Sequence, residues 1–160
     1  MRRLSTVAFM AALILAVPTG AGAAVPERGS FDFGYESFVD QEVCAAAPWG
    51  FDVNATEHEY GTYQLFFDAT GKITRIAIHL NYDATISANG KTLIERDTWT
   101  QFLTPDGSRS VGATVLIRDA HGVVQRDAGQ LVFDENGDLR LIRGPHDQFL
   151  GGSFCPALAA

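Results

Sequence analysis

The feature that most constrains this fold is a regular alternation of extended, apolar-rich runs with short turn sequences. Runs at 64–67, 73–86, 92–102, 111–117, 123–133 and 139–143 are separated in turn by D-A-T-G, N-G, P-D-G, D-A-H-G and D-E-N-G. Asn-Gly is a strong signal for a two-residue hairpin, because both central positions of that turn need a positive φ. The D-x-x-G sequences suit a type I turn followed by a left-handed glycine. Consecutive hairpins of this kind predict an antiparallel meander.

The length of these runs predicts that the sheet of the meander closes on itself. Strands of roughly 9–15 residues are long for a small open sheet, and closing the sheet removes its exposed edges. We therefore expect an all-β fold, an antiparallel meander closed into a single, roughly eight-stranded β-barrel. This barrel domain is expected at 48–160, after an N-terminal lead segment at 25–47.

The first 24 residues have the pattern of a cleaved secretory signal peptide. Arg2 and Arg3 form a positive head, 7–17 is almost entirely apolar, and A-G-A-A at 21–24 offers small residues for cleavage. The apolar run is too short to span a bilayer. The paired arginines leave twin-arginine export open beside the general route. The sequence therefore predicts a secreted protein.

Charge and hydropathy exclude several classes of partner. The net charge of −7 becomes −9 once the leader is removed, because the leader carries Arg2 and Arg3 and no acidic residue. Such a chain is repelled by phosphate backbones and anionic lipid, so we expect no nucleic-acid partner. With no second hydrophobic run, no membrane association is expected after cleavage, and we expect a monomer or a weak oligomer without a cofactor.

The two cysteines, Cys44 and Cys155, are far apart in the sequence. In an oxidising compartment such an even pair predicts a disulfide. A redox-active pair would need a tight spacing such as C-x-x-C, which is absent. We expect a bridge that ties both tails to the domain.

The Asn-Gly turn sets a register for the hairpin around it. A two-residue turn at Asn89-Gly90 places Ile86 opposite Leu93 and Asp83 opposite Arg96, an opposite-charge pair that supports this register. The face that carries Ile86 is the apolar one and is therefore expected to be buried. The same parity, continued through the later turns, places Val111 and Val123 on this inner face.

The inner face is also expected to carry polar and aromatic side chains that suit a ligand. The candidate binding residues are Tyr82, Glu95, Asp97, Trp99, Gln101, Asp127 and Arg143, with Gln125 beside them. Buried carboxylates must be paired, protonated or in contact with water, so their presence suggests a wet cavity. The alternative is a one-residue slip at a β-bulge, for which Ala128-Gly129 is a candidate, or residues that lie at a solvated barrel end.

The histidines do not predict a metal site. His58 lies between two glutamates, but strand alternation points it away from both, and zinc needs three or four convergent ligands. We therefore expect no bound metal. The G-P-H-D sequence at 144–147 is either a rigid turn or the place where His146 and Asp147 form a general acid/base pair at the barrel mouth.

Several features together resemble small secreted actinobacterial proteins without an assigned function. These features are the Ala-rich leader, the meander with D-x-x-G turns, the R-G-P-H sequence at 143–146 and the terminal F-C-P-A-L. The expected barrel is also similar to lipocalin and allene oxide cyclase barrels, in architecture only, since no motif of either family is present. A shared barrel does not determine function.

We expect an exported β-barrel protein that binds a small molecule in its interior. One alternative is a barrel enzyme, an isomerase, cyclase or hydrolase that uses Asp97 and Asp127 as acid/base partners. Another is an extracellular protein-interaction module with a filled core and an exposed apolar patch.

Overall fold

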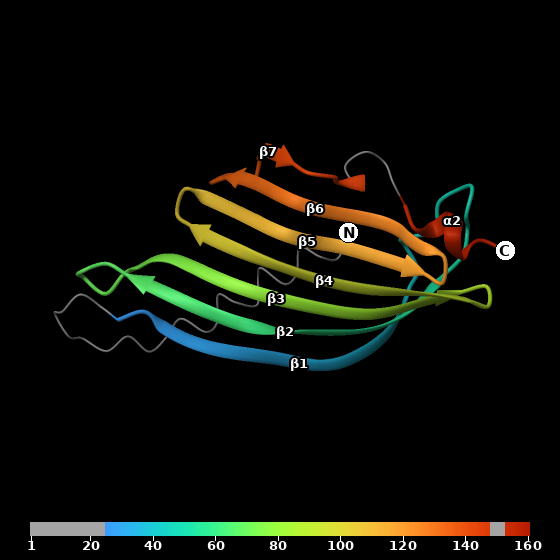
Figure 1. Cartoon of the computed structure of the whole chain (residues 1–160), viewed down its shortest axis with the longest axis horizontal. Coiled ribbons are helices and arrows are strands. Elements are labelled where there is room, and N and C mark those ends of the chain that lie inside the picture. The colour runs from blue at the N-terminus through green and yellow to red at the C-terminus, as the bar shows by residue number, and fades with distance from the viewer. Residues whose placement is uncertain (1–24, 148–152) are drawn as a thin grey trace.

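The protein folds into one curved antiparallel sheet with a short helix at one end (Figure 1), as shown by a computed structural model that describes residues 25–147 and 153–160. The elements are β1 (Glu27–Asp40), β2 (Val53–Phe67), β3 (Ile73–Ala88), β4 (Lys91–Thr104), β5 (Gly107–Asp119), β6 (Gly122–Asp134), β7 (Leu139–Arg143) and the helix α2 (Cys155–Leu158). The strands lie in the sheet in sequence order, which confirms the all-β meander. The expected leader, 1–24, lies outside the described residues.

The sheet is not closed into a barrel, and this part of the expectation is wrong. Within the described residues it has seven strands in place of about eight, and β1 and β7 form its two edges. Closure would require these two strands to pair along their length, but β7 has five residues against fourteen in β1. The expected lead segment, 25–47, itself supplies β1, so the sheet begins earlier in the chain than predicted.

The hairpin of β3 and β4 has the predicted register. Asn89 and Gly90 have φ angles of 52° and 76°, which a two-residue turn of this type needs. Ile86 lies opposite Leu93, and Asp83 opposite Arg96, whose Nε is 3.8 Å from Oδ1 of Asp83. We call the face that carries Ile86 and Leu93 the core face, and the opposite one the outer face.

Two β-bulges shift the later strands away from the predicted parity. The β5–β6 register changes by one residue at Thr114 and changes back at Val124. Before the first bulge, Ser110 is therefore buried and Val111 is 41% exposed. Before the second, Val123 is 52% exposed while Val124 packs against the core. The inward placement expected for Val111 and Val123 is thus wrong, because an extra residue in one strand exchanges its two faces.

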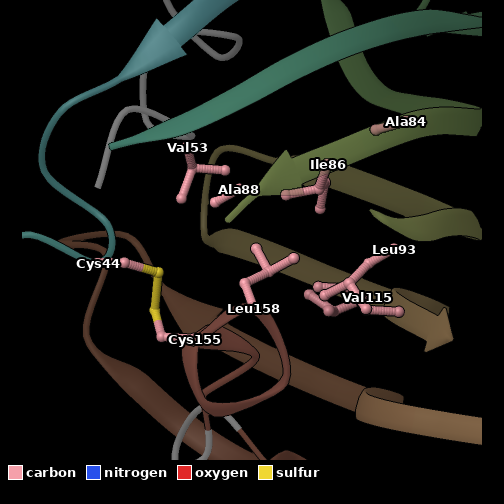
Figure 2. Close-up of a cluster of buried hydrophobic side chains, with 10 residues drawn as sticks. Cys44, Val53, Ala84, Ile86, Ala88, Leu93, Val115, Cys155 and Leu158 are labelled. Carbon is pink, nitrogen blue, oxygen red and sulfur yellow. A yellow bond between two sulfur atoms is a disulfide. The ribbon is translucent and has the colours of Figure 1, made fainter. Parts of the chain in front are cut away.

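The apolar core lies at the end of the sheet that α2 covers (Figure 2). Leu158 of α2 packs with Val53, Ile86, Leu93 and other buried residues of β2 to β5. Asn89 Nδ2 donates a 3.0 Å hydrogen bond to the carbonyl of Leu158, which joins the β3–β4 turn to the helix.

The predicted disulfide is confirmed in the structure. Cys44, in the loop after β1, is bonded to Cys155 at the start of α2, with a Cα–Cα distance of 5.7 Å (Figure 2). Both cysteines are buried in the core. In the described residues, no helix has the length and apolar character required to cross a membrane.

Candidate functional site

Two rows of side chains that cross the core face form the candidate site. The first polar row follows the register from Glu57 through Ala84, Glu95 and Ile117 to Gln125. The second polar row follows it from Glu59 through Tyr82 to Asp97, where the β4–β5 register is interrupted, and continues from Val115 to Asp127 and then to His146. Both rows lie beside the apolar core rather than at a solvated rim. The polar residues toward β4 to β6 are buried in the packed interior, whereas those toward β2 and β3 are only partly buried.

The acidic residues predicted on the inner face lie where the hairpin register places them. Glu95, Asp97 and Asp127 are only 1%, 2% and 2% exposed. Burial of carboxylates is costly unless hydrogen bonds or charges compensate for lost water. Part of that compensation is visible at Asp97, whose Oδ1 accepts a 2.6 Å hydrogen bond from the backbone N–H of Leu116. This bond lies at the β5 bulge, so Asp97 also supports the irregular part of the sheet.

The segment after β7 places His146 at the end of the second polar row. The Ala128 N–H donates to the Pro145 carbonyl at 2.7 Å, and an isolated bridge pairs Asp127 with His146. A glycine is required at residue 129, because a Cβ there would lie 1.9 Å from the Arg143 carbonyl oxygen. His146 is 3% exposed, and its Nε2 donates to that same carbonyl at 3.2 Å.

The contacts of Asp147 do not favour the acid/base pair with His146 that was one of the two alternatives for this segment. Oδ2 of Asp147 accepts a 2.7 Å hydrogen bond from the backbone N–H of Arg126. The backbone bridge places His146 opposite Asp127 instead, and the sequence did not indicate this because the bridge pairs two separate segments of the chain.

Glu57 and Glu59 belong to the site, although the sequence analysis considered them only as metal ligands. The Tyr82 hydroxyl donates a hydrogen bond to Oε2 of Glu57. Glu59 is half-buried, and burial raises its pKa, with a further increase from the negative charge of Glu57. Strand alternation in the sequence predicts the placement of both glutamates on the core face. Tyr63 and Leu65 lie on the core face, opposite Ile78 and Ile76, and counting back in steps of two from them reaches both glutamates.

The remaining predicted site residues lie in different places. Trp99 is opposite Leu80, and Gln101 is opposite Ile78, so both are on the core face beyond the second polar row, where they are partly buried. Arg143 is exposed and pairs with Gln130, whose neighbour Leu131 is the buried residue. Its expected inward placement is wrong, because the β6–β7 register shifts between Val132 and Phe133.

The outer face carries a separate cluster around His58. The His58 ring lies between Tyr35 and Tyr60, with ring centroids 4.5 and 4.7 Å away. Its Nε2 is 2.7 Å from Oδ1 of Asp32, and this hydrogen bond lowers the pKa of Asp32. As predicted, His58 points away from Glu57 and Glu59. Within the described part of the chain, no three His, Cys, Asp or Glu side chains are placed to hold a metal ion.

Replacement of Glu59 by Gln is expected to stabilise the protein at neutral pH. The pKa of Glu59 is raised in the folded protein, so its ionisation lowers stability as the pH rises above the unfolded value of about 4.3. Glu59→Gln removes this effect. We expect a melting temperature about 1–3 °C above wild type at pH 7 and no gain at pH 3.5. Thermal unfolding followed by circular dichroism at both pH values measures the difference.

The exposed Glu135→Gln change in the β6–β7 turn is the matched control for Glu59→Gln, and it should leave both melting temperatures unchanged. An unchanged or lower melting temperature for Glu59→Gln at pH 7 would contradict the assignment of Glu59 as a destabilised carboxylate.

Comparisons of the chain with protein-family models, with curated proteins and with solved structures find no match.

Proposed function

We propose that this protein is exported and binds a small molecule on the core face, over the two polar rows. The observation that carries the proposal is the burial of Glu95, Asp97 and Asp127 on the same face as the apolar core. A face that served only to pack the sheet would carry apolar residues at these positions, since buried charge is costly. Ligand pockets combine apolar walls with a few convergent polar groups in this way.

The aromatic residues on this face support the proposal. Tyr82 is in the second polar row, and Trp99 lies one position further along β4 on the same face. Both are only partly buried. Aromatic side chains supply contact area for a ligand, while the acids and Gln125 orient its polar groups.

The disulfide supports the exported location. Disulfides form and persist mainly in oxidising compartments, and Cys44 is bonded to Cys155 across most of the chain. This agrees with the leader expected at 1–24.

Native mass spectrometry of the oxidised, exported protein tests the binding proposal. We expect an adduct that is lost on mild activation, and at least tenfold less of it in the double variant Glu95→Gln with Asp97→Asn. These changes remove charge and keep the shape, and the Asn side-chain oxygen can still accept the bond from Leu116. Asp83→Asn on the outer face is the matched control and should keep the adduct.

A bare mass for the wild-type protein would overturn the proposal. It would favour an interaction through exposed side chains instead, such as Phe33 and Tyr35 on β1.

A second candidate function, acid/base catalysis on the bound molecule, rests on the pairing of Asp127 with His146. Nε2 of His146 donates a hydrogen bond to the Arg143 carbonyl, which fixes the orientation of the ring. An aspartate beside a histidine oriented in this way is a common general-base arrangement. It differs from the Asp97–Asp127 pair expected from the sequence, because the histidine replaces one carboxyl group as the base.

A further inference from the structure

We propose that a groove on the outer face, between Arg75 of β3 and Arg109 of β5, binds a small organic anion. The two arginines hold its oxyanion head group, and apolar side chains of the groove contact its body. This site is separate from the one proposed on the core face, so either proposal can fail without the other.

The groove lies at the end of the sheet opposite to α2, where β3 begins and β4 ends (Figure 1). Its volume of about 320 Å³ is at the small end of the range for ligand pockets, about 300–1,000 Å³. Ala77, two residues after Arg75, lies opposite Phe102, which in turn lies opposite Arg109. The two arginines therefore flank one aromatic side chain. The lining includes Arg75, Phe102, Thr104, Asp106, Arg109 and Val132.

A phenylalanine ring positions each guanidinium group. Cζ of Arg75 is 3.8 Å from the centroid of Phe66, and Cζ of Arg109 is 4.7 Å from that of Phe102. Arginine stacks on aromatic rings because its guanidinium is planar and weakly hydrated. A side chain that is restricted before binding loses less entropy when a ligand arrives. The two guanidinium groups are therefore partly organised for a ligand.

The positive charge of the groove is not neutralised within the described part of the chain. Arg96 forms an ion pair with Asp83, and Arg140 with Asp134, but no such pair includes Arg75 or Arg109. Asp106 lines the groove without an ion pair to either arginine in this part of the chain. Two arginines beside one aspartate give the groove a local positive charge, in a chain whose net charge is −7.

These groups suit a carboxylate, sulfate or phosphate that is attached to an apolar body. A guanidinium group has N–H donors and no acceptor, and two parallel N–H groups match two oxygens of such an anion. The acidic chain repels anions from a distance, so a head group alone is expected to bind weakly. Phe102 and Val132 are only partly buried and supply apolar contact for the body.

An NMR titration of the oxidised, ¹⁵N-labelled protein at low ionic strength tests the site. The probes are phenylacetate and phenyl phosphate, which compare a carboxylate with a phosphate head group. Acetate and inorganic phosphate are the head groups without a body, 2-phenylethanol is the neutral control and phenethylamine the cationic control. We expect at least one aromatic anion to shift the Nε–H signals of Arg75 and Arg109 and the amide signals of 102–109. It should bind at least tenfold more tightly than every control.

Variants of the exposed arginines test the contribution of each guanidinium. Arg75→Gln and Arg109→Gln should each weaken binding of this anion by at least fivefold. Arg109→Lys keeps the charge but loses the planar group, and should weaken it by at least threefold. Arg118→Gln is the matched control, because Arg118 is an exposed arginine opposite Ile94, toward the α2 end of the sheet. It should bind the anion as wild type does.

The possible results separate this site from the one on the core face. Equally tight binding of 2-phenylethanol would overturn the anion assignment, and equally tight binding of inorganic phosphate would overturn the role of the apolar body. No binding of either aromatic anion, or signal shifts confined to other residues, would overturn the site itself. The double variant Glu95→Gln with Asp97→Asn should bind the anion as wild type does, since its changes lie on the core face.

Discussion

Removal of the Cys44–Cys155 disulfide is expected to lower the free energy of unfolding by about 5 kcal/mol. The bridge joins residues 111 positions apart, so it restricts nearly the whole unfolded domain. In the chain-entropy model, the benefit of a cross-link grows with the length of the loop it closes. Single domains typically have only about 5–15 kcal/mol of stability. The loss is therefore a large share of the total.

The double variant Cys44→Ala with Cys155→Ala measures this contribution, because alanine leaves no buried polar group at these core positions. Guanidinium unfolding followed by tryptophan fluorescence gives the free energy of unfolding for the variant and for the oxidised wild type. Wild type in reductant is the second reference and should unfold at nearly the same midpoint as the variant. A loss below about 1 kcal/mol would show that other contacts hold both tails in place, against the entropic argument.

Leu158→Ala is expected to cost about 2–5 kcal/mol, the range for truncation of a large buried aliphatic side chain. Leu158 is fully buried and packs from α2 onto Val53, Ile86 and Leu93 (Figure 2). The helix has only four residues, so its own hydrogen bonds contribute little and it depends on this contact. The truncation should therefore loosen the cover over this end of the core.

Val123→Ala is the matched control, since Val123 is an aliphatic residue with half of its side chain exposed. It should change the free energy of unfolding by less than about 0.5 kcal/mol. Both variants are measured by denaturant unfolding with the disulfide intact. An equal, small effect for the two would indicate that α2 does not stabilise the core.

Comparison of the two halves of the sheet shows how far the candidate site could be predicted. In β3 and β4 the Asn89-Gly90 turn determines the register, so Tyr82, Glu95 and Asp97 were placed on the core face correctly. Arg143 and His146, after β6, were not placed correctly, because they follow register shifts that no local sequence pattern marks. Gly129 was suspected as a bulge, but the shifts lie at Thr114 and Val124. A bulge is stabilised by specific contacts, such as the bond from Leu116 to Asp97, which connect different strands.

The sequence by itself determined the number and order of most strands, the turns between them, the pairing of its two cysteines and the buried acids of β4. These follow from local rules: turn residues set backbone angles, strand alternation sets side-chain direction, and two cysteines allow one intramolecular pairing. Only the tertiary structure decided that β1 joins the sheet, that β7 ends too early for closure and that His146 meets Asp127. Edge pairing, bulges and the path of the chain after β7 depend on contacts between residues far apart in sequence. Their energies add up only when the whole sheet is assembled.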